Sequence, residues 1–147
     1  MEAKNVEEST PNTSNIVAHV IRLLPDQDLY KEIRSYVNSN NIQACFIMTC
    51  VGSLKKINIR LASGQTFLTL EKNFEIISLV GNVSIEREHL HISLSDETGK
   101  AIGGHLLDGN LVYTTAEIVL GVLPSLKFTK AICEKSGWEE LVISKIN

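Results

Sequence analysis

The stretch HLHISLSDETGKAIGGH, from His89 to His105, predicts a β-hairpin and carries three of the four histidines of the chain. Polar and apolar residues alternate in its first half, as they do in a strand with one buried face. Gly99 suits the left-handed position of a three-residue loop formed by residues 97–99. With this loop, His91 lies directly opposite His105 and all three imidazoles project from one face. A loop of two or four residues would turn His105 to the opposite face.

Three histidines on one face, with no fourth protein ligand, are typical of a catalytic zinc site, which keeps one coordination position open. Neutral imidazole also suits iron, nickel and copper, so the pattern predicts Zn²⁺ or another divalent transition metal. Gly103 and Gly104 leave space beside the three metal-ligand candidates, which are His89, His91 and His105. The alternative is that these histidines lie on a solvated sheet face and only alternate with the core side.

Two charged residues interrupt apolar segments and are further candidates for the site. Glu117, in YTTAEIVLG, would act as a catalytic general base or support a metal ligand if it faces the histidines. Arg22, in IVAHVIRLL, would bind an anion or a carboxylate. For both residues a surface position is the alternative. His19 is interpreted as a satisfied histidine rather than a ligand, and the turn at residues 86–88 as an ordinary solvated turn.

Length and composition indicate one globular domain of 147 residues, with 44% hydrophobic and 21% charged residues. The net charge of −3 argues against a large surface for nucleic acid, and Lys55, Lys56 and Arg60 form only a small basic patch. Three cysteines without framework spacing fit free thiols in a cytoplasmic or nuclear protein. The sequence has no secretory signal pattern and no apolar segment that would span a bilayer, so we expect no membrane association.

The order of the predicted elements indicates an α+β fold. Residues 1–15 are polar and are expected to form a disordered tail, which leaves residues 16–147 as the domain. A strand at residues 16–24 precedes a helix that Asp26 or Asp28 would cap. The remaining segments predict strands at residues 42–51, 54–62, 66–70, 74–85, 89–95, 101–107, 111–123, 128–134 and 138–144. Together they predict a curved, mostly antiparallel sheet or open barrel with one main helix packed on it.

Four stretches in this order resemble the PPC (plant and prokaryote conserved) domain family: NFEIISLVG (73–81), HLHISLSDETG (89–99), IGGHLLDG (102–109) and TTAEIVLG (114–121). The resemblance covers roughly residues 16–143 and implies a homotrimer. In plants the domain follows an AT-hook, a short basic arm that enters the minor groove of A·T-rich DNA, and it contacts transcription factors. The acidic and polar start of this chain contains no such arm. The three histidines are similar to those of the stand-alone prokaryotic branch.

The fold group is also similar to acetolactate decarboxylase, in which an His-x-His pair and a later histidine hold a zinc ion. The matching positions are His89, His91 and His105, although the spacing to the third histidine is longer here. This resemblance favours a metal site whose ligand is a small carboxylate or carbonyl compound. It leaves open whether the protein binds this ligand or is an enzyme that transforms it. The alternative function is a DNA-binding or transcription-regulatory module that acts as a homotrimer.

Overall fold

The computed structural model describes residues 11–146, so the first ten residues of the predicted tail lie outside the described residues. Residues 11–16 have no regular secondary structure. The elements that follow are β1 (Val17–Leu23), α1 (Leu29–Ser39), β2 (Cys45–Arg60), β3 (Phe67–Leu70), β4 (Phe74–Val83), β5 (Glu88–Ser95), β6 (Ala101–Leu106), β7 (Leu111–Val122), β8 (Leu126–Ile132) and β9 (Glu139–Lys145). They follow the predicted order along the chain.

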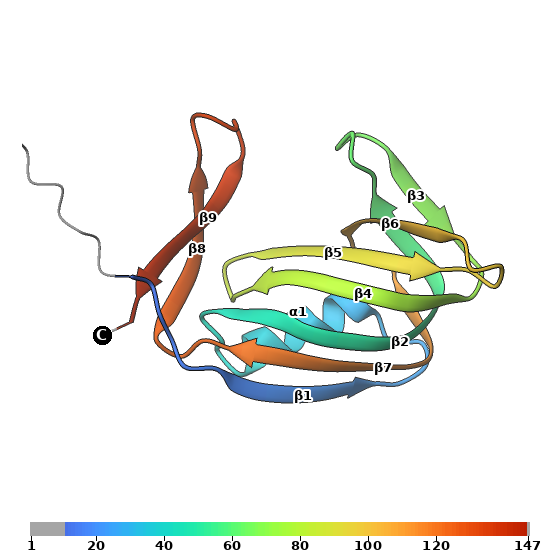
Figure 1. Ribbon diagram of the computed structural model, residues 1–147, viewed down its shortest axis with the longest axis horizontal. Helices are drawn as coiled ribbons and strands as arrows, with labels where there is room; N and C mark the ends of the chain where they lie inside the picture. The colour runs from blue at the N-terminus through green and yellow to red at the C-terminus, as the bar shows by residue number, and fades with distance from the viewer. Residues whose placement is uncertain (1–10, 147) are drawn as a thin grey trace, which may run out of the picture.

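Seven strands form one sheet in the order β1–β7–β2–β4–β5–β6, with β3 paired to β2 (Figure 1). Every pairing between these strands is antiparallel. The sheet curves so strongly that β6, its last strand, meets the far end of β2. Strands β8 and β9 form a separate hairpin that rises beside this sheet. The predicted α+β class, with a curved antiparallel sheet and one main helix, is confirmed.

The helix α1 begins where the sequence predicted it. The Asp28 carboxylate accepts hydrogen bonds from the backbone N–H groups of Tyr30 (3.0 Å) and Lys31 (3.2 Å), which caps the first turn. The residues that the helix buries against the sheet recur at helical spacing: Leu29, Ile33 and Val37. None of the helices in the described part of the chain is long and apolar enough to cross a membrane.

The strand β2 corrects one sequence prediction. Two strands were expected at residues 42–51 and 54–62, but β2 runs through Gly52 as one strand of 16 residues. Gly52 has a φ of 152°, and the register of β2 against β7 shifts on either side of it. A Cβ atom at Gly52 would lie 2.0 Å from the carbonyl oxygen of Thr115 on β7. The glycine therefore lets β2 bend and pass close to β7 without ending the strand.

The three cysteines provide a test of the packing around β2. Burial raises the pKa of Cys45 to about 11 and that of Cys50 to about 12. Hydrogen bonds from the backbone N–H groups of Ser136 and Lys135 lower the pKa of the partly exposed Cys133. We expect dithiobis(nitrobenzoate) to label Cys133 alone in the native protein and all three thiols after unfolding, because the thiolate is the reactive form. Rapid labelling of a second thiol in the native protein would contradict this packing.

Candidate metal centre

The β5–β6 hairpin has the predicted three-residue loop. The Asp96 backbone N–H donates to the Lys100 carbonyl (3.0 Å), and the Gly99 N–H donates to the Asp96 carbonyl (2.9 Å). Gly99 has a φ of 81°, in the left-handed region where glycine is favoured. This loop places His91 directly opposite His105 in the antiparallel pair. The register on which the site depends is therefore confirmed.

The two faces of β5 separate core residues from the histidines. Leu90, Ile92 and Leu94 are buried in the main core beneath the sheet. His89 and His91 are exposed on the opposite face, where the half-buried His105 of β6 joins them. Because side chains alternate along a strand, burying the three apolar residues necessarily presents both β5 histidines on the outer face.

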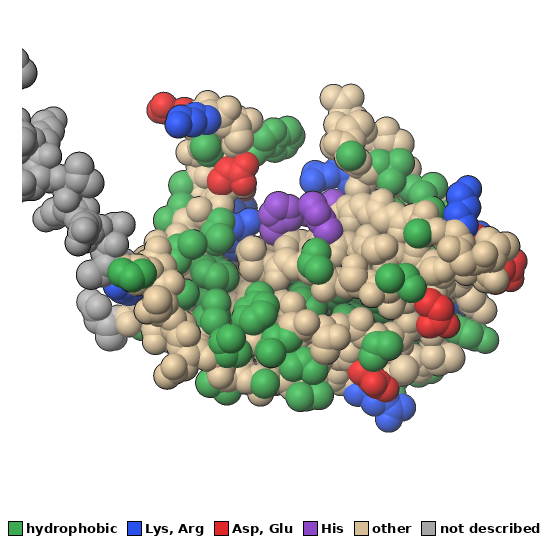
Figure 2. Space-filling view, in the orientation of Figure 1, with side chains coloured by type: hydrophobic (Ala, Val, Ile, Leu, Met, Phe, Trp, Pro, Cys, Tyr) green, Lys and Arg blue, Asp and Glu red, His purple; other side chains and the backbone are tan. Residues whose placement is uncertain are grey.

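The three imidazoles converge to within the reach of one metal ion. One ring nitrogen from each of His89, His91 and His105 lies within 4.8 Å of the others. The Nε2 atoms of His89 and His91 are 3.2 Å apart. Two nitrogens bound to one tetrahedral zinc ion are separated by about 3.3 Å, so these two already fit. In Figure 2 the histidines lie at the bottom of a hollow between the β8–β9 hairpin and the β2–β3 end of the sheet.

The electrostatic environment keeps two of these imidazoles in the form that binds metal. Burial, then the charges of Arg60 and His91, lower the pKa of His105 to about 4. Burial, then His91 and Arg87, also lower the pKa of His89. A lowered pKa favours the neutral imidazole, which is the form that ligates a metal. The Nδ1 atom of His105 is buried and has no hydrogen-bond partner among the described residues. These observations fit a three-histidine metal site.

The glycines before His105 allow the strands around the site to approach closely. A Cβ atom at Gly104 would lie 2.5 Å from the carbonyl oxygen of Arg60, and one at Gly103 would lie 2.5 Å from that of Ile92. The two glycines therefore allow this close backbone approach. It brings β6 against both β2 and β5, and Arg60 lies opposite His105 in the β2–β6 pair.

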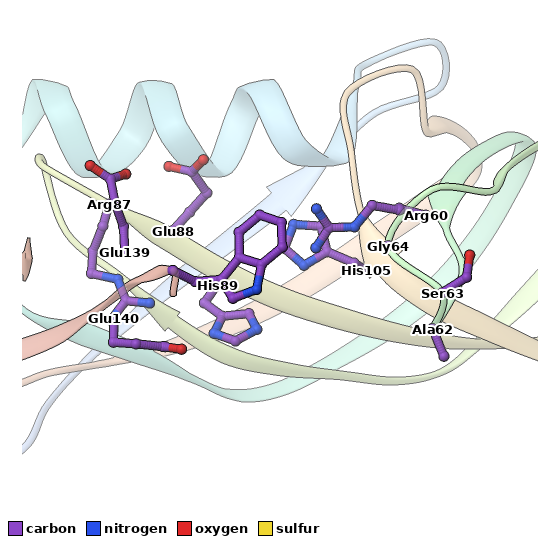
Figure 3. Close-up of a pocket in the computed structure, with 11 residues that line it drawn as sticks. Arg60, Ala62, Ser63, Gly64, Arg87, Glu88, His89, His105, Glu139 and Glu140 are labelled. Carbon is purple, nitrogen blue, oxygen red and sulfur yellow. The ribbon is translucent and has the colours of Figure 1, made fainter. Parts of the chain in front are cut away.

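Two cavities adjoin the histidines. One has a volume of about 410 Å³ and is lined by Arg60, Arg87, His89 and His105, together with Glu88, Glu139, Glu140, Trp138 and residues of the loop after β2. The other has a volume of about 430 Å³ and is lined by Arg60, His91, His105 and both glycines of β6. Figure 3 shows Arg87 on the His89 side of the first cavity and Arg60 on the His105 side. The open side of the site is therefore accessible to a small molecule.

Glu117 and Arg22 lie elsewhere in the fold. They are exposed and directly opposite each other on β7 and β1. Glu117 also pairs with Val51, nine residues along β2 from Arg60, which is up to about 30 Å along the strand. Neither residue lines the two cavities beside the histidines. Nothing in their placement supports a catalytic role for Glu117 or ligand binding by Arg22, and both occupy the surface position given as the alternative.

His19 matches the sequence prediction, whereas the turn before β5 does not. The Nδ1 atom of His19 is 2.9 Å from the Tyr36 hydroxyl, so His19 is satisfied within the fold as expected. The turn at residues 86–88 is not an ordinary solvated turn, because Arg87 is buried and faces the histidine pocket. Sequence reasoning missed Arg87 because a charged run gives no signal that one of its members points inward.

Comparison with known proteins agrees with this arrangement. The Plants and Prokaryotes Conserved (PCC) domain matches residues 11–124. The chain belongs to this family. The PCC domain family is the PPC family that the four sequence stretches resemble. The β8–β9 hairpin lies beyond the matched residues.

Three solved structures illustrate the range of the fold. A hypothetical protein from Salmonella cholerae-suis is 39% identical, with a TM-score of 0.89 over 91% of this chain and 97% of that chain. A PPC protein from Pyrococcus horikoshii is 28% identical, with a TM-score of 0.72 over 90% and 99% of the two chains. The metal-containing protein AF0104 from Archaeoglobus fulgidus is 23% identical, with a TM-score of 0.76 over 90% and 99%. At that identity the last comparison shows the fold alone.

Two longer proteins contain a similar region. The Bifunctional protein GlmU of Synechococcus sp. (strain JA-3-3Ab) is 37% identical over 134 residues, which are 91% of this chain and 22% of that protein. The AT-hook motif nuclear-localized protein 8 of Arabidopsis thaliana is 28% identical over 113 residues, which are 70% of this chain and 29% of that protein. The chain thus spans less than a third of the length of these curated relatives.

Proposed function

We propose that this PPC-domain protein binds a divalent metal ion, zinc in the first place, through His89, His91 and His105, and that the metal recognises a small oxygen-rich ligand. The observation that carries this proposal is the convergence of three ring nitrogens within 4.8 Å on the floor of an open hollow. The name of the Archaeoglobus fulgidus protein, which describes it as metal-containing, supports a metal in this fold. The free cysteines fit a cytoplasmic location.

The chemistry of the site suits a carbonyl or carboxylate ligand. His89, His91 and His105 would hold the zinc ion, which would offer such an oxygen a coordination position and Lewis-acid chemistry. The chain itself supplies orientation: Arg60 and Arg87 flank the histidines, and the two adjoining cavities admit a small molecule. The same arrangement would serve a ligand-binding protein or a metal-dependent enzyme acting on this ligand.

Elemental analysis of protein purified without chelators and without a metal-affinity tag tests the metal centre. We expect about one metal ion per chain, because three imidazoles form a complete set of protein ligands for zinc. The combined His91→Ala and His105→Ala variant should lose the metal while the fold is retained. His19→Ala is the matched control, since His19 hydrogen-bonds to Tyr36 outside the cluster, and it should retain the metal.

A metal content below about a tenth of an equivalent in folded wild-type protein would contradict the metal centre, because a preformed site binds its metal in the native state. Metal retention by the double histidine variant would place the ion elsewhere in the molecule. In either case circular dichroism establishes that the sheet is folded before the metal content is compared.

We also propose that the protein assembles as a homotrimer, as the family resemblance implies. Support comes from large hydrophobic side chains exposed on the sheet strands: Val20 of β1, Met48 and Val51 of β2, and Ile77 and Val80 of β4. Figure 2 shows hydrophobic side chains spread over this part of the molecule. An exposed apolar surface of this kind is typical of a protein–protein interface.

Sedimentation velocity tests the assembly. We expect a single species with three times the mass of the chain. Combining Val51→Asp with Ile77→Asp should convert it to folded monomers, because charged side chains are unfavourable in the centre of an apolar interface. Phe67→Asp is the control, as Phe67 is an exposed apolar residue on β3. A monomeric wild type would contradict the trimer.

The alternative function is DNA binding, by the protein itself or within a regulatory assembly. Structural neighbours include a Bacteroides thetaiotaomicron protein named for a suspected DNA-binding role, at 18% identity. The charges of this chain argue against direct binding. Lys55 forms an ion pair with Asp26 and Lys56 with Glu71 (3.1 Å), so acidic residues accompany the only basic patch that the sequence suggested. The net charge of −3 also argues against direct binding to DNA.

A mobility-shift experiment separates the two functions. We expect no shift of an A·T-rich duplex even at low ionic strength, where any electrostatic attraction to phosphate is strongest. A shift that weakens steeply with added salt would contradict this expectation and favour DNA binding. The metal-loaded and metal-free forms should behave alike in this assay.

A further inference from the structure

Two arginines extend the histidine cluster into a larger site. Arg60 ends β2, lies opposite His105 in the β2–β6 pair, and lines both cavities beside the histidines. Arg87 precedes β5 and lines the larger opening on the His89 side (Figure 3). Two cationic groups, one at the end of β2 and one in the turn before β5, therefore face the space above the proposed metal.

Arg87 is buried without a full set of partners. Only 7% of its surface is exposed, and its Nη1 atom is buried with no hydrogen-bond partner among the described residues. Burying a cation is unfavourable unless hydrogen-bond acceptors or an anion meet it. Because Arg87 lines the cavity of about 410 Å³, a ligand bound there would supply the acceptor.

The turn that carries Arg87 is held in place from the helix. The Arg34 Nη1 atom of α1 donates to the carbonyl oxygens of Ser84 (2.6 Å) and Arg87 (3.2 Å), and its Nη2 atom donates to that of Ile85 (3.2 Å). The Ser84 hydroxyl oxygen accepts from the Arg87 backbone N–H (3.2 Å). These bonds fix the backbone from which the Arg87 side chain extends before any ligand binds, which reduces the ordering that binding requires.

Three carboxylates also line the cavity, but two of them are already paired. Glu88 forms an ion pair with Arg34 (3.4 Å), and Glu139 forms one with Lys130 (2.6 Å). Glu140 forms no ion pair with any residue in the described part of the chain. The two arginines outnumber this one carboxylate, which leaves an excess of one positive charge before a metal is added.

We propose that Arg60 and Arg87 bind the carboxylate of a small ligand whose second oxygen group reaches the metal held by the three histidines. This inference rests on the metal centre proposed above and names the ligand class of that site. A planar guanidinium matches a carboxylate through paired hydrogen bonds. The excess positive charge at the cavity, to which a divalent metal would add, suits an anionic ligand.

Calorimetric titration of the zinc-loaded full chain with malonate tests this assignment. Arg60→Met and Arg87→Met should each weaken malonate binding by roughly tenfold or more, because each removes charge-assisted hydrogen bonds, while zinc per chain is unchanged. Malonamide, the neutral analogue, should not bind. Lys100→Met removes an exposed cation at the other end of the β5–β6 hairpin and should leave malonate affinity unchanged.

Thermal unfolding without malonate distinguishes a ligand-binding arginine from a structural one. The midpoint of Arg87→Met should equal or exceed that of the wild type, because the variant removes a buried cation with an unpaired group. A lower midpoint combined with unchanged malonate affinity would give Arg87 a structural role and overturn the proposal. If Arg87→Met does not fold, the malonate titration of Arg60→Met still tests the proposal, because Arg60 is only half-buried.

The remaining outcomes separate the ligand class from the metal centre. Equal malonate affinity in the wild type and both arginine variants would overturn the proposal. Tighter, arginine-dependent binding of inorganic phosphate would overturn the carboxylate class. If the wild type takes up no zinc, the metal centre is wrong. Arginine-dependent binding of malonate by the metal-free protein would then still support the arginine pocket. If the metal-free protein does not bind malonate either, both the metal centre and the arginine pocket are overturned.

Discussion

The hydrogen bonds that close the β5–β6 loop determine whether the three histidines lie on one face of the sheet. The Asp96 carboxylate accepts from the backbone N–H groups of Thr98 (2.9 Å) and Lys100 (3.1 Å), and from the Nζ atom of Lys72 (3.0 Å). The hydrogen bond that the Thr98 hydroxyl donates to the same carboxylate (2.7 Å), followed by those from Lys72 and the backbone, holds the pKa of the Asp96 carboxyl well below its usual range. These hydrogen bonds fix the loop at three residues, and a slip of one residue would turn His105 away from its partners.

Close packing of the β6 and β2 backbones then places further residues beside the histidines of the hairpin. Because Gly104 has no side chain, β6 can lie against the end of β2, and this contact is what brings Arg60 beside His105. The curvature of the sheet depends on β2 remaining continuous through Gly52. The histidines therefore come from one local hairpin, while the residues around them come from distant parts of the chain.

This difference explains how much the sequence could predict. The cap at Asp28, the hairpin register and the convergence of the histidines depend on residues close together in the chain, and local rules for turns and alternation were sufficient. Arg87 could not be found this way, because the helix α1 holds its backbone through Arg34 and the β8–β9 hairpin completes the cavity that it lines. Arg22 and Glu117 attracted attention as charges in apolar strands, but these strands have one exposed face and both residues lie on it.

The burial of Arg87 is a stronger indication of ligand binding than the histidines alone. The exposed His89 and His91 are compatible with a solvated surface, since water satisfies their nitrogens at little expense. A buried guanidinium with an unpaired nitrogen lowers stability by an amount on the order of 1–3 kcal/mol for each unmet group, and a hydrophobic residue of similar size would avoid this loss. The arginine lies beside the histidines, next to Glu88, whose carboxylate accepts from the Tyr30 hydroxyl (2.7 Å). The buried Nδ1 atom of His105, which lines the same cavity, is also unpaired, and a metal and a ligand bound in this cavity would explain both unpaired nitrogens.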